Sequence, residues 1–448
     1  MAGTLRPTTV SAKQQRIAEL AKQMPNAALT SLSHHIDLDW MREAFRVTRK
    51  DGAPGIDGQT GVDYERELES NLTSLLDRAK KGDPYRAPPV RRVFIPKANG
   101  EQRPIGIPTF EDKVLQRAVM MAIEPVYEQD FLDCSFGFRP NRSAHQALDR
   151  LRDEIMAMGG GWVLEIDIQS FYDSVDHRHM QEILRLRIRD GVILRLIGKW
   201  LNAGVLEEGR LERPDAGTPQ GGVISPLLAN VYLHVVLDVW FEQDVVPRLA
   251  GRAAMVRYAD DAVFVFSDRS DAERVLAVLH KRFERYGLTL HPEKTKLVPF
   301  RRPPRDPPRD DRGPPKPGTF NFLGFTHYWG RSRRGKRVVK VKTAKDRMAR
   351  AFRKINEWLG RVRHWAVRDQ HAALCRKLRG HDAYYGVTFN ARSLQRLRHW
   401  IERAWLRWLR RRSQRHRLTW ERMRRLLERY PLPRARIVHS HVGSETKA

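Results

Sequence analysis

Continuous and alternating runs of apolar residues predict a few strands set between longer helices. Residues 90–107 predict a hairpin, because two β-rich arms flank an Asn99-Gly100 turn. Residues 162–168 (WVLEIDI) are typical of a buried strand, and residues 254–266 (AMVRYADDAVFVF) place two apolar arms around a short acidic centre. Helical spacing occurs before, between and after these strands, over residues 11–50, 62–80, 111–129, 143–157 and 271–287. This order of elements predicts an α+β fold rather than a wound parallel sheet.

The pattern beyond residue 340 is helical, and one predicted helix there has two distinct faces. Its apolar positions recur on one face, at Leu394, Leu397, Ile401, Trp405 and Trp408. Four arginines line another face, at Arg396, Arg403, Arg407 and Arg410. A basic face opposite an aromatic core is a reasonable surface for nucleic acid, and the solvated face of a helical bundle is the ordinary alternative. Seven prolines in residues 301–318 predict an exposed linker before this helical part.

Short polar and glycine-rich segments predict where helices begin and where loops lie. Ser143 is expected to cap a helix, and Ser170 stands three residues before Asp173, the spacing of a capping box. Ser225 is expected to cap a further helix, with Pro226 at its first position. Glycines predict two shaped loops, GAPGIDG at 52–58 and GTPQGG at 217–222.

The charge is unevenly distributed, and this narrows the expected class of partner. The 448 residues hold 82 Lys and Arg but 53 Asp and Glu, which gives a net charge of +29. Residues 1–330 carry a net charge of +2, whereas residues 331–448 carry +27 together with six of the 11 Trp. Such an excess favours a polyanionic partner, and nucleic acid is the commonest one. The helical part is therefore the expected site of nucleic-acid binding.

Other features of the composition exclude several classes of protein. A hydrophobic content of 41% excludes a disordered basic tail. Cys134 and Cys375 are far apart in sequence, so neither a disulfide framework nor a cysteine-based zinc site is expected. No apolar run is long enough to cross a bilayer and the N-terminus has no apolar signal core, so we expect a cytoplasmic location.

The acidic centre at 258–261 (YADD) is the most informative element for chemistry. Asp260 and Asp261 are adjacent carboxylates between apolar arms, where a divalent cation would offset the cost of burying their charge. Asp167 ends a second apolar strand and points to the same place if the two strands are neighbours. Three such carboxylates could hold two Mg²⁺ ions about 3.5–4 Å apart, the arrangement for in-line phosphoryl transfer. An ordinary Asp-rich turn and an ordinary helix cap are the alternatives for the separate motifs.

The predicted hairpin carries four cationic side chains, Arg91, Arg92, Lys97 and Arg103. Lys97 and Arg103 flank the turn, where flexible cationic ends could clamp phosphates. For Arg91, a solvated position at the edge of the hairpin is an equally fair interpretation.

Several motifs together resemble the group II intron-encoded reverse transcriptases, also called maturases. YADD at 258–261 is similar to the active-site box of that family, and EIDIQSFYDSVDH at 165–177 is similar to the block with its first catalytic aspartate. The other similar blocks keep the family's order and are GAPGIDG at 52–58, SFGFRPNRSAHQAL at 135–148, GTPQGGVISPLLAN at 217–230, GLTLHPEKTKL at 287–297, FNFLGF at 320–325 and LRGHDAYYGV at 378–387. The resemblance extends over about residues 40–440.

The resemblance implies a right-hand polymerase fold. Fingers and a palm, whose antiparallel sheet carries the YADD hairpin, would be followed by an all-helical thumb or X domain. The implied domains are an N-terminal helical extension at 1–50, fingers at 51–160, a palm at 161–330 and a basic thumb at 331–448. Nothing after about residue 440 resembles the HNH endonuclease with its paired cysteines, so we expect the bacterial type that lacks this domain.

The resemblance also implies roles for individual residues. The implied metal ligands and catalytic groups are Asp167, Asp260 and Asp261. The implied nucleotide contacts are Lys97, Arg103, Tyr172 and Gln220. Among these, Tyr172 holds the position of the steric gate, which excludes a ribose 2′-hydroxyl and is more often Phe in the family. Lys294 is implied to lie near the primer or the phosphates, and Arg139 and Asn141 are implied to contact the template or the nucleotide.

The implied function is an RNA-directed DNA polymerase with roles in RNA splicing and in retrohoming. Its implied cofactor is Mg²⁺, two ions per active site, with Mn²⁺ as a substitute. Its implied partners are an RNA template, intron RNA, a DNA primer or target and deoxynucleoside triphosphates, with no membrane, and the oligomeric state is left open. A host-co-opted or CRISPR-associated reverse transcriptase remains an open alternative. A splicing factor on an inactive polymerase is disfavoured by the three aspartates, and a viral-type RNA-dependent RNA polymerase by YADD in place of GDD.

Overall fold

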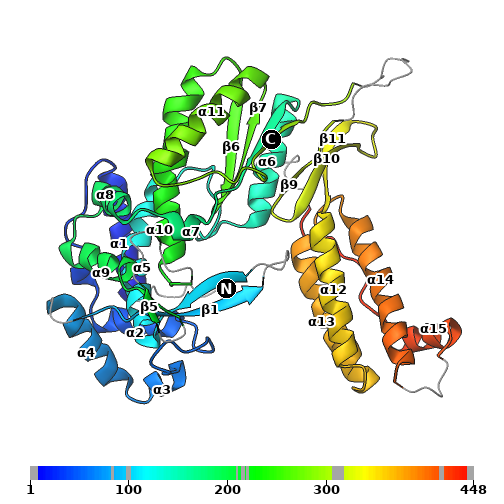
Figure 1. Ribbon diagram of the computed structural model, residues 1–448, viewed down its shortest axis with the longest axis horizontal. Coiled ribbons are helices and arrows are strands. Elements are labelled where there is room, and N and C mark those ends of the chain that lie inside the picture. The colour runs from blue at the N-terminus through cyan, green and yellow to red at the C-terminus, as the bar shows by residue number, and fades with distance from the viewer. Residues whose placement is uncertain are drawn as a thin grey trace, which may run out of the picture. The chain divides into compact units, whose positions relative to one another are not determined.

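The computed structural model describes residues 9–81, 85–96, 102–207, 210–212, 217, 221–304, 317–412 and 418–440. Lys97, the Asn99-Gly100 turn and Gln220 lie outside the described residues. The chain folds into two compact units: unit 1 comprises Met1–Ala147, Ile166–Phe264 and Ser270–Lys296, and unit 2 comprises Leu148–Glu165, Val265–Arg269 and Leu297–Ala448. Helices and sheets occur together (Figure 1), which confirms a mixed fold, whereas the right-hand arrangement and the four domains stay predictions.

Unit 1 is built mainly from helices that surround short strands (Figure 1). The helices before its first hairpin are α1 (Thr9–Gln23), the 3-10 helix η1 (Ser33–His35), α2 (Leu38–Val47), α3 (Gly61–Glu65) and α4 (Leu68–Lys81). The later ones are α5 (Phe110–Asp130), α7 (Phe171–Ser174), α8 (His177–Arg187), α9 (Gly191–Leu201), α10 (Ser225–Leu233), the π-helix η2 (His234–Val245), the 3-10 helix η3 (Val246–Arg248) and α11 (Arg269–Arg285).

A four-stranded sheet with the order β2-β1-β4-β5 contains the predicted hairpin. Its strands are β1 (Val90–Pro96), β2 (Gln102–Ile107), β4 (Val205–Glu207) and β5 (Arg210–Glu212). β1 and β2 pair antiparallel, with Arg92 opposite Gly106, so the hairpin is confirmed. β1 also pairs in parallel with β4, Val90 lying opposite Val205, which the local sequence pattern does not predict.

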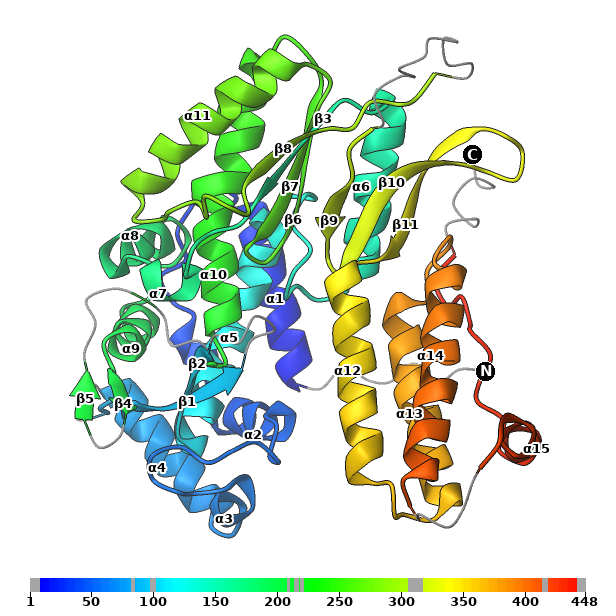
Figure 2. The ribbon, with the colours of Figure 1, turned by 45° about the vertical axis from the view of Figure 1, so that its right-hand side comes forward.

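A second four-stranded sheet carries the YADD turn and has the order β6-β7-β3-β8 (Figure 2). Its strands are β6 (Ala253–Tyr258), β7 (Asp261–Phe266), β3 (Trp162–Ile166) and β8 (Lys296–Pro299). β6 and β7 are joined by only two residues, Ala259 and Asp260, and therefore form a tight hairpin. β3 and β7 are neighbours in the sheet, as the expected approach of Asp167 to Asp260 requires.

Of the helix starts predicted at Ser143, Ser170 and Ser225, the first is confirmed, the second is wrong and the third is shifted by one residue. Ser143 caps its helix as expected, because its Oγ accepts a hydrogen bond of 3.2 Å from the backbone N–H of Gln146. The prediction for Ser170 is wrong: this residue adopts φ 45° and makes no side-chain capping bond. Its carbonyl oxygen accepts instead from the backbone N–H of Asp173 at 2.8 Å. α10 begins one residue earlier than expected, with Ile224 at the cap and Ser225 inside the helix.

The described residues of unit 2 include a helix, a small sheet and a group of further helices, besides most of β3 and β8. These elements are α6 (Ala144–Met158), β9 (Phe320–Phe322), β10 (Phe325–Arg331), β11 (Arg337–Thr343), α12 (Lys345–Arg361), α13 (Val367–Tyr385), α14 (Ala391–Arg410) and α15 (Trp420–Arg429). The sheet is antiparallel with the order β11-β10-β9. The helical part begins at Lys345, because residues 337–343 form a strand.

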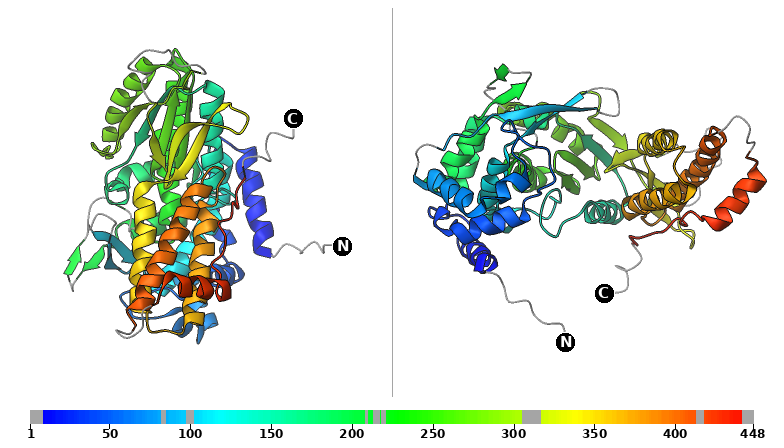
Figure 3. Two further views of the ribbon diagram at one scale, coloured as in Figure 1. Left: turned by 90° about the vertical axis from the view of Figure 1, so that its right-hand side faces the viewer. Right: turned by 90° about the horizontal axis from the view of Figure 1, so that it is seen from below.

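Helices α12, α13 and α14 lie side by side around an apolar core (Figures 1 and 3). The two faces predicted for α14 are confirmed: Leu394, Leu397, Ile401 and Trp405 are buried and Trp408 is partly buried. The arginines of its opposite face are exposed, and we call them the α14 arginines: Arg396, Arg403, Arg407 and Arg410. Among the described helices, none is both long enough and apolar enough to cross a membrane.

Two buried charged residues tie the N-terminal segment to the body of unit 1. The guanidinium of Arg187 pairs with Asp130 at 2.7 Å and donates to the carbonyl oxygens of Ala21, Met24 and Ala27. Asp190 caps α9 and also accepts from the backbone N–H groups of Leu32 and Ser33, at 2.8 and 2.7 Å. Residues 21–33 are therefore held by side chains more than 150 positions later in the chain.

Candidate active site

The turn between β6 and β7 positions the acidic pair of the YADD motif. Ala259 adopts φ 57°, in the left-handed region that alanine rarely enters, and it is 7% exposed. Asp260 is partly buried, whereas Asp261 is exposed. The turn therefore holds the first carboxylate against the protein and leaves the second toward solvent.

Asp167 directly follows β3 and is held by pairing with a segment after α11. The backbone N–H of His291 donates to the carbonyl oxygen of Asp167 at 2.8 Å, and the N–H of Gln169 donates to that of Thr289 at 2.8 Å. This pairing places Lys294 beside the carboxylate, with its Nζ 2.8 Å from Asp167 Oδ2. The sequence blocks at 165–177 and 287–297 therefore meet at Asp167.

Asp167 and Asp260 lie close enough for their charges to interact. Burial raises the pKa of Asp260, and the negative charge of Asp167 raises it further. Arg103 and Arg257 act in the opposite direction and lower that pKa. Two carboxylates that repel each other in a partly buried site favour the binding of a cation.

The donor set of this pair fits a magnesium site. Mg²⁺ prefers oxygen ligands and is commonly held by one or two carboxylates together with the phosphates of a substrate. Asp167 and Asp260 match this pattern. Within the ranges that the structure describes, no group of three His, Cys, Asp or Glu side chains is placed to hold a metal ion. Asp261 is exposed, and its part in a cluster of three carboxylates stays a prediction.

Tyr172 and Arg103 complete the group around Asp260. The ring of Tyr172 packs against Phe171 with a centroid distance of 5.5 Å. Burial raises the pKa of Tyr172 to about 12, the charge of Asp260 contributes to this, and Arg103 opposes it. The positive charge of Arg103 lowers the pKa of both Asp260 and Tyr172, so the three side chains lie near one another. The structure thus brings together residues of β2, α7 and the β6–β7 turn.

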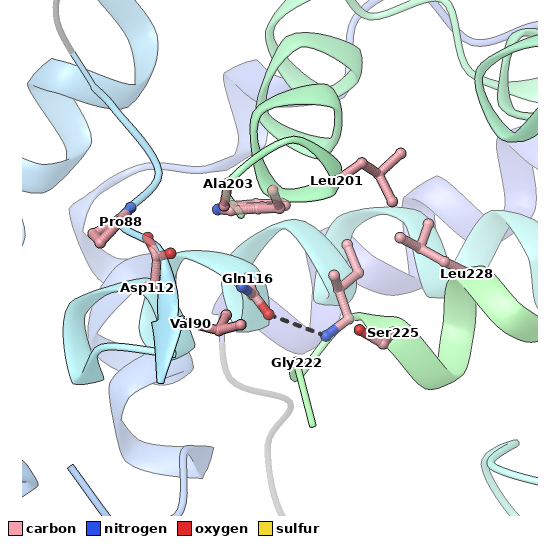
Figure 4. Close-up of a pocket in the computed structure, with 11 residues that line it drawn as sticks. Pro88, Val90, Asp112, Gln116, Leu201, Ala203, Gly222, Ser225 and Leu228 are labelled. Atoms are coloured by element: carbon pink, nitrogen blue, oxygen red, sulfur yellow. Dashed lines mark hydrogen bonds between the residues drawn. The ribbon is translucent and has the colours of Figure 1, made fainter. Parts of the chain in front are cut away.

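The ends of the GTPQGG loop are fixed against these elements. The N–H of Gly217 donates to Val175, and a Cβ added at Gly221 would lie 2.5 Å from the carbonyl oxygen of Gly106 on β2. Gln116 holds the end of the loop: its Oε1 accepts from the backbone N–H of Val223 at 2.9 Å and of Ile224 at 3.5 Å. Figure 4 shows the second of these bonds as a dashed line from Gln116. Gln220 itself lies outside the described residues, between Gly217, which contacts the end of α7, and Gly221, which contacts β2.

Two further residues expected to contact nucleic acid have different surroundings. Arg139 is 7% exposed, and its guanidinium donates to Glu128 and to the carbonyl oxygens of Leu132 and Ser135. Its donors are therefore used inside the protein, which differs from the expected contact with nucleic acid. Asn141 is exposed and adopts φ 58°, a conformation that asparagine tolerates well.

Several buried polar residues beneath the turn were not predicted from the sequence. Arg257 is buried and forms an ion pair with Asp238 of η2 at 2.5 Å. Asn230 and Ser135 are also buried, and both accept hydrogen bonds from Arg257. The available indication was an arginine inside an otherwise apolar strand, since such a residue is buried only when it is paired.

The α14 arginines differ from several exposed arginines of unit 1 in how their charge is compensated. In unit 1, several form ion pairs with acidic side chains, among them Arg42, Arg46, Arg49 and Arg66. Across the described residues of unit 2, no ion pair joins an α14 arginine to an acidic side chain. Arg396 instead stacks over Trp400, and Arg410 Nε donates to the carbonyl oxygen of Leu418. The α14 arginines therefore carry charge that acidic side chains leave uncompensated.

Two known protein families match this chain, one over its middle and one nearer its C-terminus. Residues 95–327, just over half of the chain, match the family described as reverse transcriptase (RNA-dependent DNA polymerase). Residues 348–426 match the family described as group II intron, maturase-specific domain.

Individual relatives agree with these matches. Protein YkfC of Escherichia coli (strain K12) is 34% identical over 379 residues, which cover 77% of this chain and 94% of YkfC. Group II intron-encoded protein LtrA of Lactococcus lactis subsp. cremoris is 44% identical over 167 residues, which cover 37% of this chain and 27% of LtrA. The uncharacterized 91 kDa protein in the cob intron of Schizosaccharomyces pombe is 37% identical over 175 residues, 21% of its length. The chain thus matches about a quarter of the length of these intron-encoded relatives. With a polymerase domain followed by a maturase-specific domain, the chain belongs to the reverse transcriptases of the group II intron-encoded family.

Proposed function

We propose that this protein is an RNA-directed DNA polymerase that extends a DNA primer on an RNA template by two-metal phosphoryl transfer. The observation that carries the proposal is the approach of Asp167 to Asp260 at the β6–β7 turn, with Arg103 and Tyr172 beside them. An arrangement of carboxylates, a cation and an aromatic ring suits a site that binds a nucleoside triphosphate with divalent metal.

Asp167 and Asp260 would hold Mg²⁺, or Mn²⁺ as its substitute, and Asp261 is the auxiliary carboxylate. When bound, the metal ions lower the pKa of the attacking 3′-hydroxyl and neutralise the charge of the leaving pyrophosphate. The protein's part is to hold the two carboxylates in place. Strand pairing around residue 167 orients Asp167, and the short β6–β7 turn orients Asp260.

The cationic side chains around the pair would contact the substrates. Arg103 and Lys97, from the β1–β2 hairpin, would bind the triphosphate, and Gln220 would touch the nucleotide or the primer end. Lys294 is 61% exposed in its side chain and lies against Asp167, so it would contact the primer or the phosphates. Asn141 would contact the template from the exposed loop before α6.

A primer-extension assay tests the proposal directly. The full-length protein is incubated with poly(rA) and oligo(dT) in Mg²⁺, with dTTP or UTP, and in parallel with a DNA template. We expect extension with dTTP on the RNA template that stops when EDTA removes the metal. Absence of extension with either Mg²⁺ or Mn²⁺ would contradict the polymerase assignment, and preference for UTP would indicate an RNA polymerase.

Tyr172 gives a prediction about the choice of sugar. Its partly buried ring next to Asp260 would meet a ribose 2′-hydroxyl on the incoming nucleotide. Replacing Tyr172 with alanine is expected to reduce the preference for dTTP over UTP by about 10–100-fold, the size of discrimination that a steric contact supplies. The measurement is kcat/KM for each nucleotide on the RNA template. Tyr172→Phe keeps the ring and is expected to keep the preference, and loss of preference in both variants would argue against a steric gate.

We further propose that the protein binds structured intron RNA and assists its splicing. The match of residues 348–426 to the maturase-specific domain supports this role, as does the uncompensated charge of the α14 arginines. Binding through phosphates would be strongly weakened by salt. The residues of unit 2, rather than those of the catalytic group, would then supply most of the affinity for RNA.

A further inference from the structure

We propose that Arg257 is a positioning residue for catalysis: through a buried network with Asp238, Asn230 and Ser135 it fixes the direction in which the YADD turn presents Asp260. The inference rests on the proposed polymerase function. It concerns residues that contact neither substrate nor metal, and the role proposed here runs through the backbone of the turn rather than through the charge of Arg257.

Arg257 is surrounded by protein and uses its whole guanidinium. Arg257, Asp238 and Ser135 are each 0% exposed, and Asn230 is 1% exposed. Nε and Nη2 donate to the two carboxylate oxygens of Asp238 at 2.7 and 2.5 Å. Nη2 also donates to Ser135 Oγ at 2.8 Å, and Nη1 donates to Asn230 Oδ1 at 3.0 Å. A planar guanidinium in such a network has one orientation only.

The remaining bond of Arg257 reaches the catalytic turn. Nη1 donates to the carbonyl oxygen of Ala259 at 2.9 Å. Ala259 is the residue with φ 57°, directly before Asp260, so its peptide group determines where the following carboxylate points. A non-glycine residue in this region persists only when its surroundings hold it there. The guanidinium therefore holds the turn from the side of strand β6.

The backbone at Gly137 contacts the same turn. A Cβ added at Gly137 would lie 2.3 Å from the backbone nitrogen of Ala259, so the two backbones are in direct contact. Asn230 connects both halves of this clamp: its Oδ1 accepts from Arg257, and its Nδ2 donates to the carbonyl oxygen of Gly137 at 2.6 Å. Residues of β6, α10, η2 and the loop before α6 thus converge on one peptide group.

The chemistry of the network indicates that it orients the carbonyl group of Ala259 and does more than stabilise the fold. A buried ion pair contributes little net stability, because desolvation offsets most of its Coulomb energy, and apolar residues of similar volume hold a core as well. What apolar residues lack is the ability to fix the orientation of a carbonyl group. Asp238 also lies in a 12-residue π-helix. π-Helical turns are rare in proteins as a whole, and those that occur are often found at functional sites.

Replacing Arg257 with lysine tests this role, because lysine keeps the charge opposite Asp238 but cannot serve four partners at once. We expect kcat for primer extension to fall by about 10–100-fold, since a misplacement of about 1 Å costs that much. KM for dTTP and the Kd for primer–template are expected to stay within about twofold, since Arg257 contacts neither. Hydrogen exchange of the peptide over residues 253–266 is expected to become faster.

Arg187→Lys is the matched control in the same unit. Like Arg257, Arg187 is buried, at 8% exposed, and pairs with an aspartate, Asp130. It also donates to three carbonyl oxygens, but these oxygens belong to the N-terminal segment and not to the catalytic turn. Both variants are expected to lower Tm to a similar degree, and only Arg257→Lys is expected to lose kcat. Equal kcat values for the two variants at equal folded fraction would overturn the proposal.

A third variant keeps the proposal testable if Arg257→Lys fails to fold. Ser135→Ala removes a single bond of the network and is expected to lower kcat about threefold or more with KM unchanged. A wild-type kcat for Ser135→Ala, together with unchanged exchange over residues 253–266, would then overturn it. Failure of the wild-type protein to extend a primer at all would instead contradict the polymerase assignment, and the exchange measurement would still report on the clamp.

Discussion

Replacing Asp260 with asparagine is expected to lower the rate of primer extension by about 10³-fold, because a metal ligand supplies several kcal/mol of transition-state stabilisation. The same change is expected to leave Tm unchanged or to raise it. Burial and the neighbouring Asp167 both disfavour the charged form of Asp260, and asparagine removes this unfavourable charge while keeping the shape. The measurements are single-turnover primer extension in Mg²⁺ and thermal unfolding of both proteins.

Asp244→Asn is a suitable control, because Asp244 is an exposed aspartate at the end of η2. It removes the same charge and is expected to change neither the rate nor Tm. A residual activity of Asp260→Asn within tenfold of the wild type would contradict the assignment of this carboxylate to the metal site. A large loss of Tm would indicate a structural role for Asp260 instead.

Replacing the four α14 arginines with glutamine is expected to weaken RNA binding about 100-fold at low salt and to leave kcat at saturating RNA unchanged. Each lost phosphate contact reduces the slope of log K against log salt by about 0.7–0.9, so the slope should fall by about 3. The physical reason is that these side chains carry charge that acidic neighbours leave uncompensated. Filter binding of structured intron RNA at several salt concentrations gives both quantities.

The control removes four exposed arginines from unit 1, Arg42, Arg46, Arg49 and Arg66. The net charge changes by the same amount, but each of these side chains already pairs with a carboxylate. The slope of the control is therefore expected to change by less than about 1. Equal losses of affinity in both variants would show that total charge, and not the α14 face, determines binding.

Elements determined by local patterns were predictable from the sequence. Apolar runs bounded by turn residues predicted the hairpins over 90–107 and 254–266, and helical spacing predicted both faces of α14. Ser143 was predictable as a cap because capping involves residues within one turn. The same local rule failed at Ser170, where pairing around Asp167 leads the chain into a left-handed conformation instead.

Features that depend on distant residues were not predictable in this way. The pairing of β1 with β4 joins segments more than 100 residues apart, and local patterns contain no information about it. Arg139 matches a family block, but only the structure shows that Glu128 occupies its guanidinium. Arg257 and Ser135 are 122 positions apart, so their bond and the clamp on the turn become visible only after folding.

The attachment of the N-terminal segment to Arg187 and Asp190 has a consequence for the order of folding during synthesis. Residues 21–33 find their hydrogen-bond partners only after residue 190 has left the ribosome. At about 5–20 residues per second, the ribosome makes the intervening chain in roughly 10–30 s. A segment that is made early therefore waits for partners 157 or more positions later in the chain, and during this interval it is available to chaperones.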